Sequence, residues 1–103
     1  MTETRELYSG LIRLHVLHHG CHEPFFGLWM IEELSRHGYR LSPGTLYPLL
    51  AAMERRGLLR SSREHVNGKI RRMYRATPAG RAALRIAKKR VQELFGELFE
   101  DER

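Results

Sequence analysis

Apolar residues near the start of the chain recur with the period of a helix. Between residues 4 and 19, a stripe of residues repeats at four- and three-residue steps and so shares one face of an amphipathic helix: Leu7, Leu11, Leu14 and His18. Ile12 and Val16 widen this stripe. Gly20 is expected to end this helix, because glycine favours the left-handed turn that closes a C-terminus. The chain is therefore expected to begin with a helix that presents an apolar stripe.

A turn and a second, shorter helix come next. Residues 21–26 include Pro24 and predict a turn, and residues 27–37 predict a helix that ends at Gly38. The side chains expected to be buried on this helix are Leu28, Ile31 and Leu34. Only a brief link leads on to a third helix, and this spacing is typical of a helix-turn-helix unit.

The third predicted helix lies within residues 42–59. Ser42 can cap its N-terminus, Pro43 suits its first position, and Gly57 is placed to end it in a left-handed turn. The stripe expected to be buried consists of Leu46, Leu49, Leu50 and Met53. The opposite face carries Gly44, Pro48, Ala51, Ala52 and Arg55. Small residues let a helix backbone approach another large surface closely, so we interpret this segment as a recognition helix shaped for a groove.

A period of two replaces the helical period after Gly57. Two alternating segments, 59–66 and 69–76, flank Asn67-Gly68, a pair strongly favoured in two-residue hairpin turns. The turn predicts the cross-strand pairs Val66–Lys69, Glu64–Arg71 and Ser61–Tyr74. The basic residues at the tip and on the second strand are Lys69, Arg71, Arg72 and Arg75. Next to a recognition-type helix, such a hairpin is interpreted as a wing that grips phosphates; the alternative is an ordinary basic surface hairpin.

The last predicted helix starts after the cap residue Thr77, with Pro78 in the first position, and extends to about Phe99. Its apolar residues follow three- and four-residue steps, as in a coiled-coil seam: Leu84, Ala87, Val91, Leu94 and Leu98. One short domain does not easily cover so long a stripe. We therefore expect it to dimerise together with the stripe of Leu7, Leu11 and Leu14, the alternative being that both stripes close on their own domain.

Charge is segregated along the chain. The net charge is +6 over 103 residues, yet residues 55–90 contain 13 Lys or Arg and one acid, Glu64, for a net charge of +12. Clustered cations favour a polyanionic partner, because neutralised phosphates release counterions; the alternative is a solvated basic face. The lone Cys21 excludes an intrachain disulfide. Neither a membrane span nor a signal peptide is expected. The expected location is the cytoplasm.

Several motifs together resemble one family. GTLYPLL at Gly44–Leu50 is followed by GLL at Gly57–Leu59, and then by Gly68, Arg71, Arg72, Tyr74, Arg75, Thr77 and Gly80. This pattern resembles the PadR family of bacterial transcription regulators over nearly the whole chain. The resemblance implies a winged helix-turn-helix domain, a homodimer built through its N- and C-terminal helices, and repression that a small molecule or another signal relieves. The single terminal helix is similar to the short branch of that family.

The expected fold is mainly helical with a small β-hairpin: a winged helix-turn-helix domain over residues 1–77 and a dimerisation helix over residues 78–103, packed as one unit. The expected partner is a palindromic stretch of double-stranded DNA. The residues expected to contact it at the start of the recognition helix are Ser42, Gly44, Thr45 and Tyr47. Those expected to hold its backbone are Lys69, Arg71 and Arg72.

Histidines crowd the end of the first helix. The residues of this cluster with metal-ligating side chains are His15, His18, His19, Cys21 and His22. Zn²⁺, Ni²⁺, copper or haem iron is chemically possible there, but a complete set of four ligands is not evident, so no cofactor is predicted. The alternative is that helix-terminal histidines are simply solvated or bond to carbonyl groups.

Functions other than DNA binding are weighed against the same residues. The sequence shows neither a glycine-rich phosphate loop after a strand nor paired catalytic carboxylates, so an enzyme is not expected. A winged helix that binds an acidic protein is a rival, as is a regulator that responds to a metal or haem through its histidines. Trp29, with Phe25 and Phe26 nearby, lines either an effector site or plain core.

Overall fold

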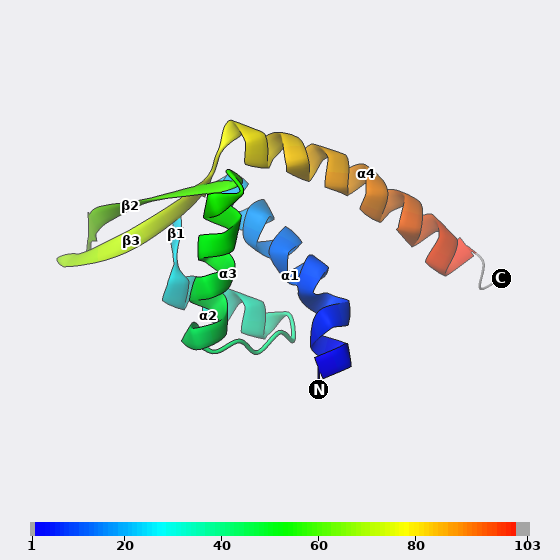
Figure 1. Cartoon of the computed structure of the whole chain (residues 1–103), viewed down its shortest axis with the longest axis horizontal. Helices are drawn as coiled ribbons and strands as arrows, with labels where there is room; N and C mark the ends of the chain where they lie inside the picture. Colours follow the sequence, from blue (N-terminus) through cyan, green and yellow to red (C-terminus); the bar gives the residue numbers. More distant parts are fainter. Residues whose placement is uncertain (1, 101–103) are drawn as a thin grey trace.

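The computed structural model describes residues 2–100. Residue 1 of the predicted domain over residues 1–77 and residues 101–103 of the predicted segment over residues 78–103 therefore lie outside the described residues. Within residues 2–100 the chain forms four helices and a three-stranded antiparallel sheet of order β1-β3-β2. It is elongated, with extents of 54 × 32 × 23 Å, because the last helix leaves the body of the molecule (Figure 1). The predicted class, helical with a small hairpin and a winged-helix arrangement, is confirmed.

Helix α1 spans Thr2–His22, so Gly20 lies inside it and the prediction that Gly20 ends the helix is wrong. A Cβ atom at Gly20 would stand 3.3 Å from both the Ala76 backbone nitrogen and a Leu59 methyl group. Gly20 therefore serves a close approach between α1 and the sheet. The core face of α1 consists of Ile12, Val16 and Leu17, so the part of the predicted stripe that is buried is the edge that Ile12 and Val16 add to it.

The predicted turn over residues 21–26 is only partly correct. Cys21 and His22 are helical, and Phe25–Phe26 form a short strand, β1, whose partners on the third strand are Tyr74 and Met73. The Phe25 ring is buried and stacks on Tyr74 with 5.7 Å between centroids. Burial of the two aromatic residues gives β1 a stability that its length alone could not provide.

Helix α2 spans Gly27–Arg36 and ends before Gly38, whose φ of +90° confirms its predicted role. Leu28 was expected in the core but is 50% exposed, whereas Met30 and Leu34 are fully buried. These two residues are four apart and share the face that meets the core, and Leu28 lies off that face.

Helix α3 spans Pro43–Arg55 and buries Leu46, Leu50 and Met53, as predicted, with Leu49 half-buried. Ser42 occupies the N-cap position, but its hydroxyl makes no capping bond to the backbone. The hydroxyl instead donates to Thr45 Oγ1 at 3.3 Å. The glycine stop is as predicted, since Gly57 has a φ of +78°.

Strands β2 (Leu59–Val66) and β3 (Lys69–Ala76) form the hairpin in the predicted register. Asn67 and Gly68 have φ values of +53° and +80°, the positive values that a tight turn with the twist of the strands demands. The sequence thus determines the register locally, through two turn residues.

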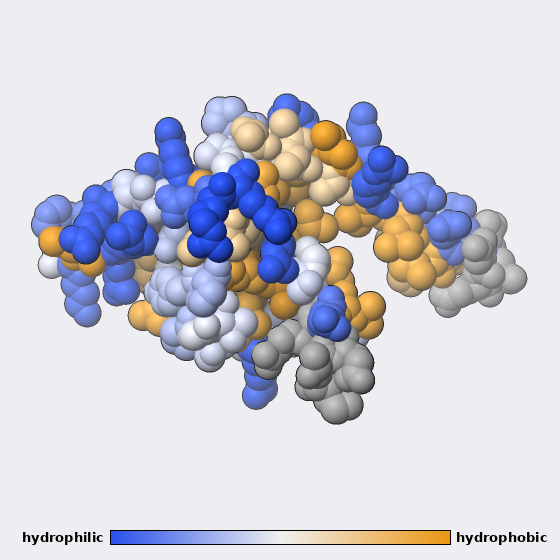
Figure 2. All heavy atoms as spheres, viewed as in Figure 1, coloured by the Kyte–Doolittle hydropathy of each residue, from blue (hydrophilic) through white to orange (hydrophobic). Residues whose placement is uncertain are grey.

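Helix α4 spans Pro78–Glu100. Thr77 caps it, since the Gly80 amide donates to Thr77 Oγ1 at 2.9 Å. Figure 1 shows α4 starting above the sheet, passing the C-terminal end of α1 and then diverging from it. Hydrophobic side chains gather along the side of α4 that faces α1, and they remain uncovered toward its end (Figure 2).

Candidate nucleic-acid interface

The face of α3 that lies opposite the core carries mostly small side chains. Gly44 and Pro48 are exposed, and Ala51 and Ala52 are half-buried. Of the predicted contact residues, Ser42 is exposed and Thr45 is half-buried, with their hydroxyls hydrogen-bonded to each other. The predicted small-residue surface is therefore present and accessible at the start of α3.

Tyr47 connects α3 to the start of α2. Its side chain is 40% exposed, and its ring lies so close to Gly27 that a Cβ atom at Gly27 would overlap the ring and the hydroxyl. The glycine at the first position of α2 therefore leaves the space in which Tyr47 lies. This contact places a phenol between the N-terminus of α2 and the exposed face of α3.

We call the hairpin, that is β2, β3 and their turn, the wing. The four basic residues singled out at its tip and on β3 differ in their surroundings. Lys69 and Arg72 are exposed, but the Arg71 guanidinium lies 4.2 Å from the centre of the Phe26 ring. Arg75 forms an ion pair with Glu64 at 2.8 Å. Lys69 and Arg72 are therefore the more available cations, while Arg71 also supports β1.

The ion pair at Glu64 is reinforced from its own strand. Ser62 Oγ donates to the Glu64 carboxylate at 2.7 Å. This hydrogen bond, and then that from Arg75, hold the pKa of Glu64 below its ordinary value. The register sets Arg71 opposite Glu64, but Arg75 is the cation that reaches it.

A polar bridge that the sequence did not indicate joins α3 to the wing. Glu54, near the end of α3, accepts hydrogen bonds from the backbone amide and the hydroxyl of Ser61 on β2. Arg72 on β3 donates to the same hydroxyl at 3.1 Å. The sequence predicted that a hairpin follows α3, but it did not indicate which side chains join them. The choice of Glu54, Ser61 and Arg72 depends on the tertiary structure.

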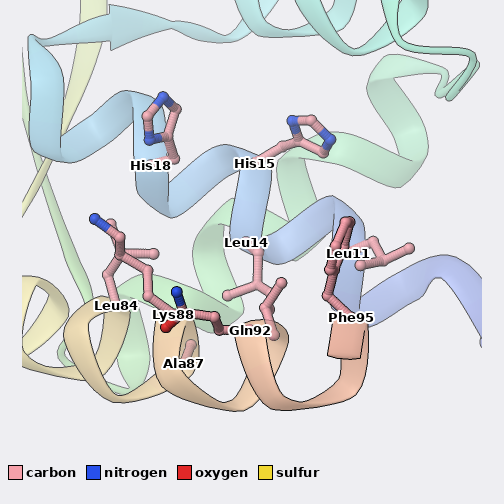
Figure 3. A pocket seen from close by; sticks show the side chains of 10 residues that line it. Leu11, Leu14, His15, His18, Leu84, Ala87, Lys88, Gln92 and Phe95 are labelled. Carbon is pink, nitrogen blue, oxygen red and sulfur yellow. The ribbon is translucent and has the colours of Figure 1, made fainter. Parts of the chain in front are cut away.

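An apolar groove of about 640 Å³ separates α1 from α4. Figure 3 shows Leu14 of α1 reaching toward α4, and Phe95 of α4 beside Leu11. Leu7 is 72% exposed, and Val91, Leu94 and Leu98 of the predicted seam are also exposed. Leu14, Leu84 and Ala87 are half-buried. The groove is thus lined by part of each predicted dimerisation stripe: Leu11, Leu14, Leu84, Ala87 and Val91. The other stripe residues, Leu7, Leu94 and Leu98, are exposed and lie outside its lining.

Comparison with known proteins supplies the family. Residues 6–86 match the sequence profile of the Transcriptional regulator PadR-like family. The chain belongs to this family. It is 52% identical over 94 residues to "Transcriptional regulator Rv3488" of Mycobacterium tuberculosis, a match that covers 91% of this chain and 88% of that protein.

Solved structures support the same assignment for this PadR-like chain. A PadR family transcriptional regulator from Eggerthella lenta has 30% sequence identity and a TM-score of 0.79, with 96% of this chain and 88% of that chain covered. A PadR-like regulator from Bacillus cereus has the same fold, with a TM-score of 0.89, 22% identity, and coverage of 95% and 97%. The family consists of transcriptional regulators and not of enzymes.

Three aromatic residues near the sheet lie partly in the core of the PadR-like fold. Phe25 is buried, and Trp29 and Phe26 are half-buried. All three line a pocket of about 330 Å³ together with Met73 and with His19, His22, Glu23 and Pro24. Core packing therefore accounts for Phe25, and the other two rings also border this pocket.

The histidines of the PadR-like chain face different partners. His15 stacks on His37 with 4.7 Å between centroids, whereas His19 packs against Trp29 and lies 3.4 Å from a Glu33 oxygen. His18 stacks on His22 at 6.0 Å, and Cys21 is half-buried. Among the side chains that the structure describes, no three of His, Cys, Asp or Glu are grouped so as to hold a metal ion.

Burial lowers the pKa of His15, and it also lowers the pKa of His19 although Glu33 opposes the shift. The hydrogen bond from His37 is the main cause that lowers the pKa of Glu33. The Glu33 carboxylate therefore holds His19 and His37, while His18 and His22 contact each other.

Across the described part of the chain, no helix is both long and apolar enough to cross a membrane.

Proposed function

We propose that this PadR-like regulator binds specific DNA sequences as a homodimer and represses promoters from the cytoplasm. The observation that carries the proposal is the small, exposed face of α3 beside a wing whose Lys69 and Arg72 are exposed. In this proposal residues 1–77 are the DNA-binding domain, and residues 78–103, which include α4, supply the dimerisation surface.

The start of α3 enters the major groove. Ser42, Thr45 and Tyr47 donate hydrogen bonds to phosphates or base edges, where the helix N-terminus also favours an anion. Gly44 and Ala51 leave room for thymine methyl groups, a contact that requires closeness. The phosphate backbone is held by Lys69 and Arg72. Arg71 also holds it while its guanidinium stays stacked on Phe26.

A second copy covers the groove between α1 and α4. The exposed seam of α4 and the exposed Leu7 and Leu11 of α1 are too extensive an apolar surface for a monomer to leave in water without cost. A two-fold axis through this surface sets two α3 helices about 34–36 Å apart, one turn of DNA. The operator is accordingly palindromic.

Relief of repression by a small molecule or another signal completes the proposal. The family resemblance supports it, together with the size of the apolar groove, which lies within the range of about 300–1,000 Å³ found for ligand pockets. An effector in the part of this groove that the second copy leaves open changes the packing of the two copies, the separation of the two α3 helices and thus the fit to the operator.

The test is a gel shift on DNA from just upstream of the gene, with unrelated competitor DNA of equal length and a salt series. A shift that resists the competitor, with two-fold-symmetric protection, is the expected result. Thr45→Ala is expected to change sequence preference. Equal binding to both DNAs would contradict specific recognition and favour the rival, a winged helix that binds an acidic protein.

A further inference from the structure

The junction between α3 and the wing contains a hydrogen-bonded bridge. The Ser61 amide donates to Glu54 Oε2 at 3.0 Å, and the Ser61 hydroxyl lies 2.9 and 3.1 Å from the two carboxylate oxygens. Arg72 Nη1 donates to the same hydroxyl at 3.1 Å. Three elements, α3, β2 and β3, are thus joined through one half-buried serine.

The bridge satisfies a sheet edge. In the order β1-β3-β2, strand β2 has a free edge, and its outward amide groups need partners. Ser61 is such a position, since its amide bonds to Glu54 and not to β3. Glu54 is the side chain of α3 that occupies this edge.

We infer that Glu54 is a positioning residue that fixes the angle of the wing relative to α3, and so determines how well this protein discriminates between DNA sequences. The inference rests on the proposed function. Glu54 itself contributes nothing to attraction, because a carboxylate on a DNA-facing element repels phosphate. Its role is to hold Ser61, and through it Arg72.

The length of the wing makes its angle important. Gly57, with its left-handed backbone, and Leu58 are the only residues between the end of the α3 cap and β2. Ser61 lies near the base of the hairpin, and Val66 at the tip is about 17 Å away at roughly 3.3 Å per residue. A rotation of about 10° at the base moves the tip by about 3 Å, which exceeds the tolerance of a hydrogen bond to phosphate.

Removing the bridge therefore has opposite effects on two kinds of DNA. Without the Glu54 charge, Arg72 is freer to meet any phosphate and a repulsive charge is gone, so non-specific affinity holds or rises. Operator affinity falls, because α3 and the wing no longer reach their sites together. A role confined to folding would weaken both kinds of binding.

The experiment measures dissociation constants for the operator and for a scrambled duplex of equal length at one salt concentration. Glu54→Gln and Ser61→Ala are each expected to lower the ratio of the two affinities about tenfold, the change that corresponds to one lost hydrogen bond to a charged group. Ser61→Thr keeps the hydroxyl and is expected to restore the ratio. Ser62→Ala, whose hydroxyl bonds within its own strand to Glu64, is the matched control.

Each outcome decides between the two proposals. If the unaltered protein prefers its operator but Glu54→Gln and Ser61→Ala keep the full ratio, the bridge has no role in discrimination and the inference is wrong, while the proposed function stands. Equal losses of affinity for both duplexes, in step with a lower melting temperature, would also overturn the inference. An unaltered protein without operator preference would refute both.

Discussion

Replacement of Gly80 by alanine tests how firmly α4 is fixed to the DNA-binding domain. Gly80 is buried in the first turn of α4, where a Cβ atom would overlap the carbonyl oxygen of Leu58 and approach a Leu17 methyl group to 3.2 Å. The carbonyl cannot turn away cheaply, because it accepts the Thr77 amide at 3.1 Å. Thr77 in turn caps Gly80.

The magnitude follows from three opposed effects. Alanine gains about 1 kcal/mol over glycine in a helix interior. Overpacking against a fixed group costs about 1–3 kcal/mol. Loosening the Thr77 cap lowers the stability by about 1 kcal/mol more. Gly80→Ala is therefore expected to lower the free energy of unfolding by about 1–3 kcal/mol, the sum of these terms.

The assay is urea unfolding followed by circular dichroism, with all variants at one protein concentration because the chain is expected to dimerise. Gly96→Ala is the matched control: its nearest neighbour atoms belong to Glu100 at 3.9 Å, on the face of α4 away from the apolar seam. That variant is expected to gain up to about 1 kcal/mol. A Gly80→Ala protein at least as stable as the unaltered chain would refute the reasoning.

Three further predictions concern the wing, Tyr47 and pH. Lys69→Ala is expected to weaken binding to all DNA sequences alike and to reduce the salt slope by about one, measured by fluorescence anisotropy in a salt series. Gly27→Ala is expected to displace Tyr47 and weaken operator binding roughly tenfold with little change in melting temperature, because an exposed ring can swing into solvent. The free energy of unfolding is expected to fall as the pH is lowered through 6.5, because burial holds the pKa of His15 below that value in the folded chain and the unfolded chain then binds more protons.

Matched variants separate these effects from general damage. Arg85→Ala removes an exposed charge on α4, away from the wing, and is expected to leave the salt slope unchanged. Tyr47→Phe is expected to reproduce the binding loss of Gly27→Ala, and the double variant to lose no more than either alone. His15→Asn is expected to reduce the pH dependence but not abolish it, because burial lowers the pKa of His19 as well. An equal fall of the salt slope in Arg85→Ala would count against the role of Lys69. Additive losses of binding in the Gly27→Ala/Tyr47→Phe double variant would count against the role of Gly27. An unchanged pH profile in His15→Asn would count against the prediction for pH.

Local chemistry made much of this fold predictable. Asn67 and Gly68 determine the hairpin register because their positive φ values fix which residues pair across the turn. The stripe of α3 is predictable for a similar reason: Leu46 and Leu50 repeat at helical spacing between two end signals within the same segment.

Contacts between distant segments explain the errors. Gly20 carries the sequence mark of a helix end, yet it lies against Leu59 and Ala76, which are far along the chain. The two residues of β1 have no strand pattern of their own and gain their conformation from β3. The bridge from Glu54 to Ser61 was equally invisible, since an acid near a helix end and a serine in a strand are each unremarkable alone.

The apolar stripe that α4 carries away from the body has a consequence for dosage. If the DNA-binding form is the dimer and dimerisation is weak, the amount of that form rises with the square of the chain concentration. A doubling of synthesis then gives about fourfold more binding-competent protein. Under the proposed function, the exposed leucines and phenylalanines of one helix would thereby make promoter occupancy rise more steeply than synthesis of the chain.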